Sequence, residues 1–220
     1  QNPRLIQPPQ VVKAVLVDYE YTGVVDQIRG NLKTVEHWIA ADPRPEKRTP
    51  EGWTDWDELV ANQPVTATPP IEQDENDVAT INYTSGTTSR PKGVMLTHRN
   101  AYINAYNFIA HLRIRHEDRE IWTLPMFHAN GWTYAWIVTA AAALHVCLRQ
   151  VDAASIYRLV NHERITMLCA APTVLIAIAS GPAEERMALR RGVRVATAGA
   201  PPAAATIERM EGELGWTLTQ

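Results

Sequence analysis

Residues 81–98 read INYTSGTTSRPKGVMLTH. The apolar run from Ala79 to Tyr83 predicts a buried strand, and a second strand is predicted from Val94 to Leu96. The loop between them holds hydroxyls, a glycine and no apolar side chain, so it adds nothing to a hydrophobic core. Loop amides, hydroxyls and a lysine charge are suited to phosphate, and glycine lets the backbone approach it closely. The expected phosphate contacts are Thr84, Ser85, Gly86, Thr87, Thr88 and Lys92.

This loop differs from the Walker A pattern, G-x-x-x-x-G-K-[ST]. Counting from Gly86, Pro91 precedes Lys92 and Gly93 follows it, so two positions fail. The alternative to a phosphate-binding loop is a surface turn, rich in serine and threonine, that joins two strands and binds no ligand. The chain has only four lysines and otherwise uses arginine, which favours a specific role for the lysine in this loop.

The composition is that of an ordinary globular protein, with 45% hydrophobic and 20% charged residues. A net charge of −3 gives no reason to expect a nucleic-acid partner. Cys147 and Cys169 are too few for a disulfide framework or a zinc site, which makes a reducing cytoplasm the expected location. The chain has no secretion signal and no initiator methionine, which favours a piece of a longer protein.

Strand-like and helix-like segments alternate along the chain, which predicts a layered α/β fold with parallel strands and sites at their carboxyl ends. A first partial α/β subdomain with linkers is expected at 1–77, and a second region, containing the phosphate loop, at 78–220. Strands are expected at 11–17, 121–124, 144–149, 167–171, 193–197 and 217–220. Helices are expected at 31–41, 56–61, 132–143, 155–161, 173–180 and 203–214, with a further helix capped by Thr97 and reaching Leu112.

One stretch, residues 131–148, approaches the length of a membrane span and carries no formal charge apart from a possible one on His145. Its alanines and threonines make it only weakly hydrophobic. A buried helix followed by a buried strand is therefore favoured, and no transmembrane segment is expected.

A histidine follows the strand predicted at 121–124, within the sequence PMFHANGW at 125–132. His128 is thereby expected at the carboxyl edge of the sheet, where ligands usually bind. Taken alone, a histidine in this position is more often a structural group, and Trp132 can be a core aromatic that opens a helix. The sequence alone leaves these alternatives open.

Another strand is followed by TAGAPP at 197–202. Gly199 permits close backbone approach, and the prolines fix a turn before the next helix. Taken alone, this is a common strand-to-helix turn.

Together these segments resemble the adenylate-forming superfamily of acyl-CoA synthetases, luciferases and peptide-synthetase adenylation domains. YTSGTTSRPKGV at 83–94 resembles its phosphate-loop signature, PMFHANGW its second motif, and AGAP at 198–201 its Gly-Gly-Ala-Pro element, with Ala198 in place of the first glycine. Ser89 replaces the usual loop glycine. The resemblance covers most of residues 11–220 and comes closest to short-to-medium-chain and plant acyl-activating enzymes.

The resemblance implies an acyl-CoA ligase of fatty-acid metabolism that uses ATP, Mg²⁺ and coenzyme A, with a homodimer left open. By this resemblance, a carboxylic acid attacks the α-phosphate of ATP, pyrophosphate leaves, and the acyl group passes from AMP to the thiol of coenzyme A. The implied sites are the phosphate loop, a metal contact at Thr84, adenine contacts at Gly199, Ala200 and Pro201, and acyl contacts at Gly131 and Trp132, with His128 in both a catalytic and an acyl-binding role.

The family places a Tyr-Gly-x-Thr-Glu element, a ribose-binding aspartate and a mobile domain with the catalytic lysine beyond Gln220. Two alternatives share the motifs of this chain. One is a non-catalytic nucleotide-binding module that kept the loop and lost the chemistry, and the other is an adenylating enzyme that loads a carrier-protein thiol. Acyl chain length is not determined by the sequence.

Overall fold

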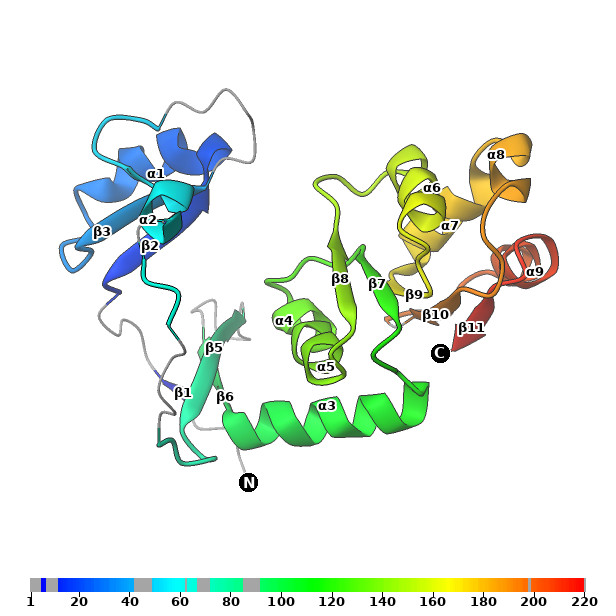
Figure 1. Ribbon diagram of the computed structural model, residues 1–220, viewed down its shortest axis with the longest axis horizontal. Helices are drawn as coiled ribbons and strands as arrows, with labels where there is room; N and C mark the ends of the chain where they lie inside the picture. Colours follow the sequence, from blue (N-terminus) through cyan, green and yellow to red (C-terminus); the bar gives the residue numbers. More distant parts are fainter. Residues whose placement is uncertain are drawn as a thin grey trace. The chain divides into compact units, whose positions relative to one another are not determined.

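The computed structural model describes residues 5–6, 12–41, 49–61, 63–66, 72–84, 92–197 and 199–219. The chain divides into two compact units, one formed by residues 6–73 and the other by 1–5 with 74–220. The predicted α/β class with parallel sheets is confirmed (Figure 1). Among the described residues, no helix is long and apolar enough to cross a membrane.

The smaller unit is a short parallel sheet with helices beside it. Its strands are paired in the order β2 (Ala14–Asp18), β3 (His37–Ala41) and β4 (Thr54–Asp55). Its helical segments are a 3₁₀ turn (Tyr19–Tyr21), α1 (Thr22–Arg29) and α2 (Trp56–Ala61). The helix predicted at 31–41 is wrong, because residues 37–41 form β3 and the helix lies earlier, in α1. Arg29 accounts for part of this arrangement, since its guanidinium lies 4.5 Å from the ring centroid of Trp38 on β3.

The larger unit begins with an antiparallel hairpin. β5 (Val78–Thr84) pairs with β6 (Lys92–Thr97), and β1 (Leu5–Ile6) completes a three-stranded sheet in the order β1-β6-β5. Both strands predicted around the loop are present. The expectation that the first is buried was wrong, because β5 is at most half-buried and Tyr83 is 53% exposed.

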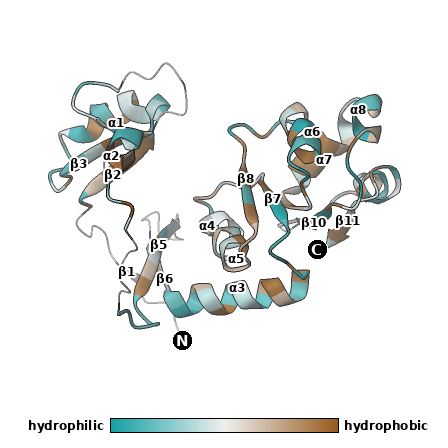
Figure 2. Ribbon diagram, viewed as in Figure 1, coloured by the Kyte–Doolittle hydropathy of each residue, from teal (hydrophilic) through white to brown (hydrophobic). Residues whose placement is uncertain are grey.

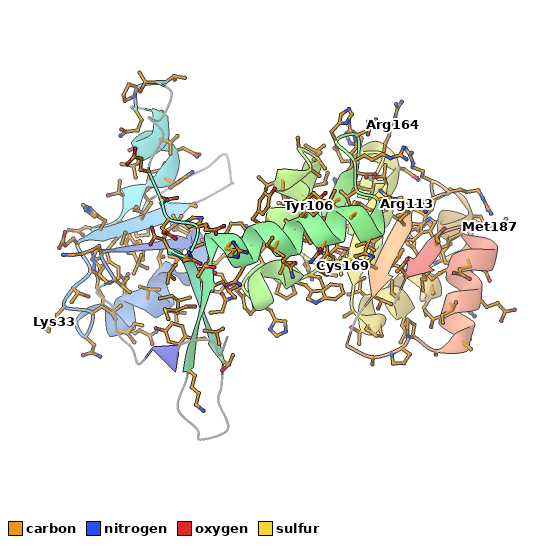
Figure 3. All side chains as sticks on the ribbon, turned by 90° about the horizontal axis from the view of Figure 1, so that it is seen from below. Lys33, Tyr106, Arg113, Arg164, Cys169 and Met187 are labelled. Atoms are coloured by element: carbon orange, nitrogen blue, oxygen red, sulfur yellow. The ribbon has the colours of Figure 1, made fainter. Side chains whose placement is uncertain are left out.

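A capping box starts α3 (His98–Leu112), which follows the hairpin directly. The Thr97 hydroxyl accepts from the Asn100 N–H at 3.2 Å, and the Asn100 side chain accepts from the Thr97 N–H at 3.1 Å. The helix ends at Arg113, which is left-handed with φ of 51° (Figure 3). This confirms the helix predicted from the cap and from the apolar spacing of its residues.

The rest of the larger unit is a five-stranded sheet in the order β11-β10-β9-β7-β8, and every recorded pair in it is parallel. Its strands are β7 (Arg119–Trp122), β8 (Leu144–Cys147), β9 (Met167–Ala170), β10 (Arg194–Thr197) and β11 (Thr217–Thr219). Its helices are α4 (Ala129–Trp132), α5 (Tyr134–Ala140), α6 (Ala153–His162), α7 (Pro172–Ser180), α8 (Ala183–Met187) and α9 (Ala204–Glu208), which continues as a π-helix (Arg209–Glu213). The sequence predicted all of these except α4 and α8.

Two apolar clusters cover the two faces of this sheet, as expected for parallel strands. Alternate residues of the central strand β9 divide between them, so that Leu168 and Ala170 face α6 and α7, whereas Met167 and Cys169 face α3 and α5. All four are buried. α7 is apolar along most of its length (Figure 2). The result is a three-layer arrangement whose strands end at a common edge.

A polar cluster holds the opposite edge, where the strands begin. The buried Asp118 carboxylate accepts from Arg194 at 2.5 Å, from Thr166 at 2.7 Å and from the Arg115 N–H at 2.8 Å. Arg194 also donates to the carbonyl of Leu112 at the end of α3, at 2.6 Å. Burial raises the pKa of Asp118, but these hydrogen bonds and the arginine charge outweigh it and hold that pKa below its usual range.

Replacing Asp118 with alanine is therefore expected to lower the free energy of unfolding by about 2 kcal/mol near pH 7, because Arg194 and Thr166 lose their acceptor. Since the pKa of Asp118 is depressed in the folded state, its contribution is present above the pKa of the unfolded chain and is lost as the pH falls through the folded value. Urea unfolding at pH 7 and pH 3 measures both effects. An equal difference between wild type and variant at the two pH values would contradict this assignment.

Candidate functional site

The two described ends of the predicted phosphate loop face each other across the hairpin. Thr84 is the last residue of β5 and Lys92 the first of β6, and they are antiparallel partners. Thr84 is exposed, and Lys92 is half-buried. Residues 85–91 lie outside the described residues, and with them the predicted contacts Ser85, Gly86, Thr87 and Thr88. The hairpin thus presents a hydroxyl and a cationic residue at the base of the loop.

The segment from Pro125 to Trp132 carries the predicted histidine and follows the carboxyl end of β7. His128 is exposed, and its backbone N–H donates to the Pro125 carbonyl at 3.2 Å. Phe127, beside it, is 86% exposed. Gly131 has a φ of +60°, a conformation that glycine adopts without strain. His128 therefore stands at the sheet edge, where the sequence placed it.

Trp132 packs into the core on the α3 and α5 face. Its ring centroid lies 5.7 Å from that of Phe108 on α3, edge to face. It lies 6.2 Å from the ring of Tyr134 at the start of α5, with the planes 17° apart. This packing agrees with the core-aromatic alternative, and a wall of an acyl site at Trp132 remains a prediction.

The turn after β10 contains the predicted adenine contacts. Gly199, Ala200 and Pro201 are all exposed, whereas Ala198 lies outside the described residues. Gly199 has a φ of +94°, and a Cβ built there would meet nothing within 4 Å. Its backbone conformation, rather than crowding, is therefore what favours glycine. An open surface above such a turn is compatible with a planar ring.

Topology brings two of the three motifs to one edge. β7, β9 and β10 are neighbouring parallel strands, so the segment carrying His128 and the turn at Gly199 leave the same edge of the sheet. With β9 between them, β7 and β10 are separated by two strand spacings, about 10 Å. Thr84 and Lys92 belong to a different sheet of the same unit. We propose below that the hairpin and this edge line one site.

Buried polar groups beneath α5 were missed by the sequence analysis. Glu120 is 1% exposed, with one carboxylate oxygen unpartnered within the described structure, and burial raises its pKa well above the usual range. Burial likewise raises the pKa of Tyr134, and that of Cys169 to about 12. Burial therefore favours the neutral form of each of these groups. The strand was predicted at 121–124, so Glu120 lay just before it, and this adjacency was the only sequence signal.

A metal cage is absent from the part of the chain that the structure describes, where no group of three or more His, Cys, Asp or Glu side chains gathers. Mg²⁺ is commonly held by one or two carboxylates together with substrate phosphates and water, and in the Walker A phosphate loop by a serine or threonine hydroxyl. The exposed Thr84 hydroxyl at the mouth of the loop is a ligand of that kind. This hydroxyl is suited to Mg²⁺ that is also coordinated by the phosphates of a nucleotide.

The sequence matches the family described as AMP-binding enzyme over residues 9–220. The chain belongs to this family. Among curated relatives of this AMP-binding chain, "Probable acyl-activating enzyme 9" of Arabidopsis thaliana is 47% identical over 60% of the chain and 24% of its own length. "4-hydroxybutyrate--CoA ligase 2" of Metallosphaera sedula is 37% identical over 92% of the chain and 37% of its own length.

A third relative of the AMP-binding chain, the peroxisomal "Trans-cinnamate:CoA ligase" of Petunia hybrida, is 37% identical over 98% of the chain and 40% of its own length. The chain thus spans well under half the length of each of these relatives. Among solved structures, the inhibitor-bound N-terminal domain of FACL13 from Mycobacterium tuberculosis superposes with a TM-score of 0.76 and 26% identity, over 93% of this chain and 48% of that one. The anthranilate CoA ligase AuaEII, solved in complex with anthranoyl-AMP, shares the fold, with a TM-score of 0.77 and 21% identity over 94% of this chain and 40% of that one.

Proposed function

We propose that this chain is the nucleotide-binding part of an ATP-dependent acid–thiol ligase. In this proposal a carboxylate attacks the α-phosphate of ATP, pyrophosphate leaves, and the acyl group passes from AMP to the thiol of coenzyme A. The observation that carries the proposal is the pairing of Thr84 with Lys92 across the hairpin that flanks the hydroxyl-rich loop containing Gly86. The names of several relatives, which include CoA ligases, support the reaction class.

The role of the hairpin follows from the charge of the transition state. The triphosphate carries several negative charges, and charge grows on pyrophosphate as the bond to the α-phosphorus breaks. Lys92 supplies a positive charge close to the β- and γ-phosphates, while the loop residues donate hydrogen bonds. Bound Mg²⁺ adds charge neutralisation, with Thr84 as the ligand from this chain.

Residues at the carboxyl edge of the five-stranded sheet line the adenine and acyl sides of the proposed site. Gly199, Ala200 and Pro201 border the adenine, and the exposed position of that turn leaves room for it. His128 borders the reacting carboxylate, with Gly131 and Trp132 on the acyl side. Residues 78–220 then form the AMP-binding region, and 1–77 part of a preceding subdomain. A cytoplasmic location stays a prediction, because one of the relatives is named as peroxisomal.

The test is a substrate screen on the full-length protein, with release of AMP measured for acids from acetate to palmitate and for aromatic acids. We expect AMP release that needs ATP, an acid and coenzyme A together. Exchange between ATP and pyrophosphate without a response to coenzyme A, but with transfer to a carrier protein, would instead indicate a loading enzyme. Absence of any acid-dependent exchange would contradict the proposal and favour a non-catalytic module.

The 220-residue chain alone is expected to bind ATP weakly and to show no turnover. The reason is that the family places its ribose contact and catalytic lysine in segments outside it. Calorimetric titration with ATP and Mg²⁺, together with an exchange assay on the same sample, measures both properties. Robust ATP–pyrophosphate exchange by this chain would contradict the assignment.

A further inference from the structure

Trp122, the last residue of β7, joins two parts of the larger unit. Its indole Nε1–H donates to Nδ1 of His145 on β8 at 2.9 Å, and the two ring planes lie within 16° of each other. At the other end of the indole, a Cβ built on Gly131 would lie 2.4 Å from Cζ3 of Trp122. The backbone of Gly131 therefore rests directly on the six-membered ring. Only glycine permits this approach, since any side chain there would overlap the ring.

The hydrogen bonds of His145 also determine its tautomer. The Thr139 hydroxyl on α5 lies 3.0 Å from Nε2 of His145 and donates its own proton to the Ala135 carbonyl at 2.7 Å. Because that hydroxyl proton is already used, Nε2 must carry the hydrogen and donate to Thr139. Nδ1 is then the acceptor that Trp122 requires. Two independent contacts thus assign the same neutral tautomer.

The segment that lies on Trp122 is held in an unusual backbone conformation. Gly131, Trp132 and Thr133 are consecutive left-handed residues, with φ of 60°, 50° and 64°. Non-glycine residues in this region cost on the order of 1 kcal/mol or more each and persist where surrounding contacts fix them. The same short segment begins at His128, whose carbonyl accepts from the Trp132 N–H at 3.2 Å. Its shape therefore depends on what lies beneath it.

We propose that Trp122, His145 and Thr139 form a positioning platform that fixes the backbone of residues 128–133, and that His145 is the positioning residue at its centre. The platform acts through Trp122 and does not touch the reactants. Its consequence for the reaction, which rests on the proposed function, is the placement of His128 and of the acyl wall. Misplacing such a segment by about 1 Å can cost up to 100-fold in rate.

The groups that surround His145 favour the neutral form of its imidazole. Glu120 is its partner in the β7–β8 register, and the β8 thiol Cys147 and the α5 hydroxyl of Tyr134 lie on the same side of the sheet. Burial raises the pKa of Glu120 and so favours its uncharged form, and α5 contributes no charged side chain. Burial lowers the pKa of His145 itself. Protonation of His145 at low pH would place a hydrogen on Nδ1 and break the bond from Trp122.

The first test uses the chain itself, labelled with ¹⁵N. Its seven tryptophans give seven indole N–H signals, and Trp122→Phe identifies the one that disappears. We expect the Trp122 signal to shift as the pH falls through the His145 titration. The shift should vanish in His145→Asn, whose side-chain oxygen replaces Nδ1 as acceptor. In His145→Phe the signal should move to an unbonded position. A Trp122 signal that is unchanged in His145→Phe would overturn the hydrogen bond.

The second measurement follows the backbone amides of His128 and Gly131. We expect both to shift in Trp122→Phe and His145→Phe and to return toward wild type in His145→Asn. Trp216→Phe is the matched control, because it removes a buried indole N–H bonded at 2.8 Å on the opposite face of the sheet. Amides of residues 128–133 that respond to Trp216→Phe as strongly as to Trp122→Phe would overturn the platform.

The third measurement is made on the full-length protein with an acid that it activates. We expect Trp122→Phe and His145→Phe to raise KM for the acid and lower kcat, with a combined loss of about 10-fold. KM for ATP should change less than 2-fold, and His145→Asn should recover most of the loss. An equal loss in Trp216→Phe would overturn the specific role. If no acid is activated, the proposed function fails, while the two spectroscopic tests still decide the platform.

Discussion

Replacing Lys92 with alanine is expected to lower the rate of acyl-adenylate formation about 100-fold in the full-length protein, which corresponds to roughly 2.7 kcal/mol of lost transition-state stabilisation. Lys92 is fixed at the start of β6 by its pairing with Thr84, so its ammonium group leaves the sheet at the base of the loop. Its strand partner Thr84 and the next residue, Gly93, are neutral. Pyrophosphate release at saturating acid and ATP measures the effect.

Two control variants separate charge at this position from charge in general. Lys92→Arg keeps the cation but changes its geometry, so we expect a partial loss of about 10-fold. Lys33→Ala removes an exposed lysine in the smaller unit and should leave the rate unchanged. A Lys92→Ala variant that behaves like Lys33→Ala would contradict the assignment of the phosphate site.

Replacing Glu120 with glutamine is expected to stabilise the larger unit increasingly as the pH rises. Burial raises the pKa of this carboxyl well above its usual range, so the folded state keeps the proton to a higher pH than the unfolded chain does. In the unfolded chain it ionises above about pH 4.5. The contribution of the Glu120 carboxyl to stability is therefore fully present below the pKa that it has in the unfolded chain. This contribution is lost as the pH rises toward the pKa in the folded state, and the folding equilibrium constant falls by up to 10-fold per pH unit.

Urea unfolding of wild type and Glu120→Gln at pH 4, 5, 6 and 7 measures this effect. Glutamine keeps a side-chain oxygen that can accept from the Cys169 N–H, so the comparison isolates the ionisation. The two proteins should be similar in stability at pH 4 and should diverge above pH 5. Parallel pH profiles would contradict a protonated carboxyl in the core.

Local sequence signals were sufficient where the residues concerned are neighbours in the chain. The helix after the hairpin was predicted from its Thr97 cap and its apolar spacing, and both features are present in α3. The strands of the five-stranded sheet were predicted from short apolar runs, with ends shifted by two residues or fewer. The family match over residues 9–220 confirms the recognition that the quoted motifs supported.

The sequence failed where a distant partner decided the conformation. Residues 31–41 have helical spacing, but the Arg29 guanidinium and the edge of β2 make residues 37–41 a strand. A pattern cannot show which neighbour a segment will meet, so tertiary context prevailed over local preference. The half-exposed character of β5 has a similar origin, since the hairpin has apolar side chains but only a small sheet to bury them.

The sequence by itself determined the family and the motifs on which the proposed chemistry rests, because the predicted phosphate loop, the histidine segment and the glycine turn are each defined by consecutive residues. Tertiary structure alone decided which of these share a sheet edge and what supports them. His145 lies 23 residues from Trp122, and Thr139 fixes its tautomer only because α5 packs beside β8. Hydrogen bonds between strands and helices depend on distances in space, and the order of residues along a chain does not contain those distances directly.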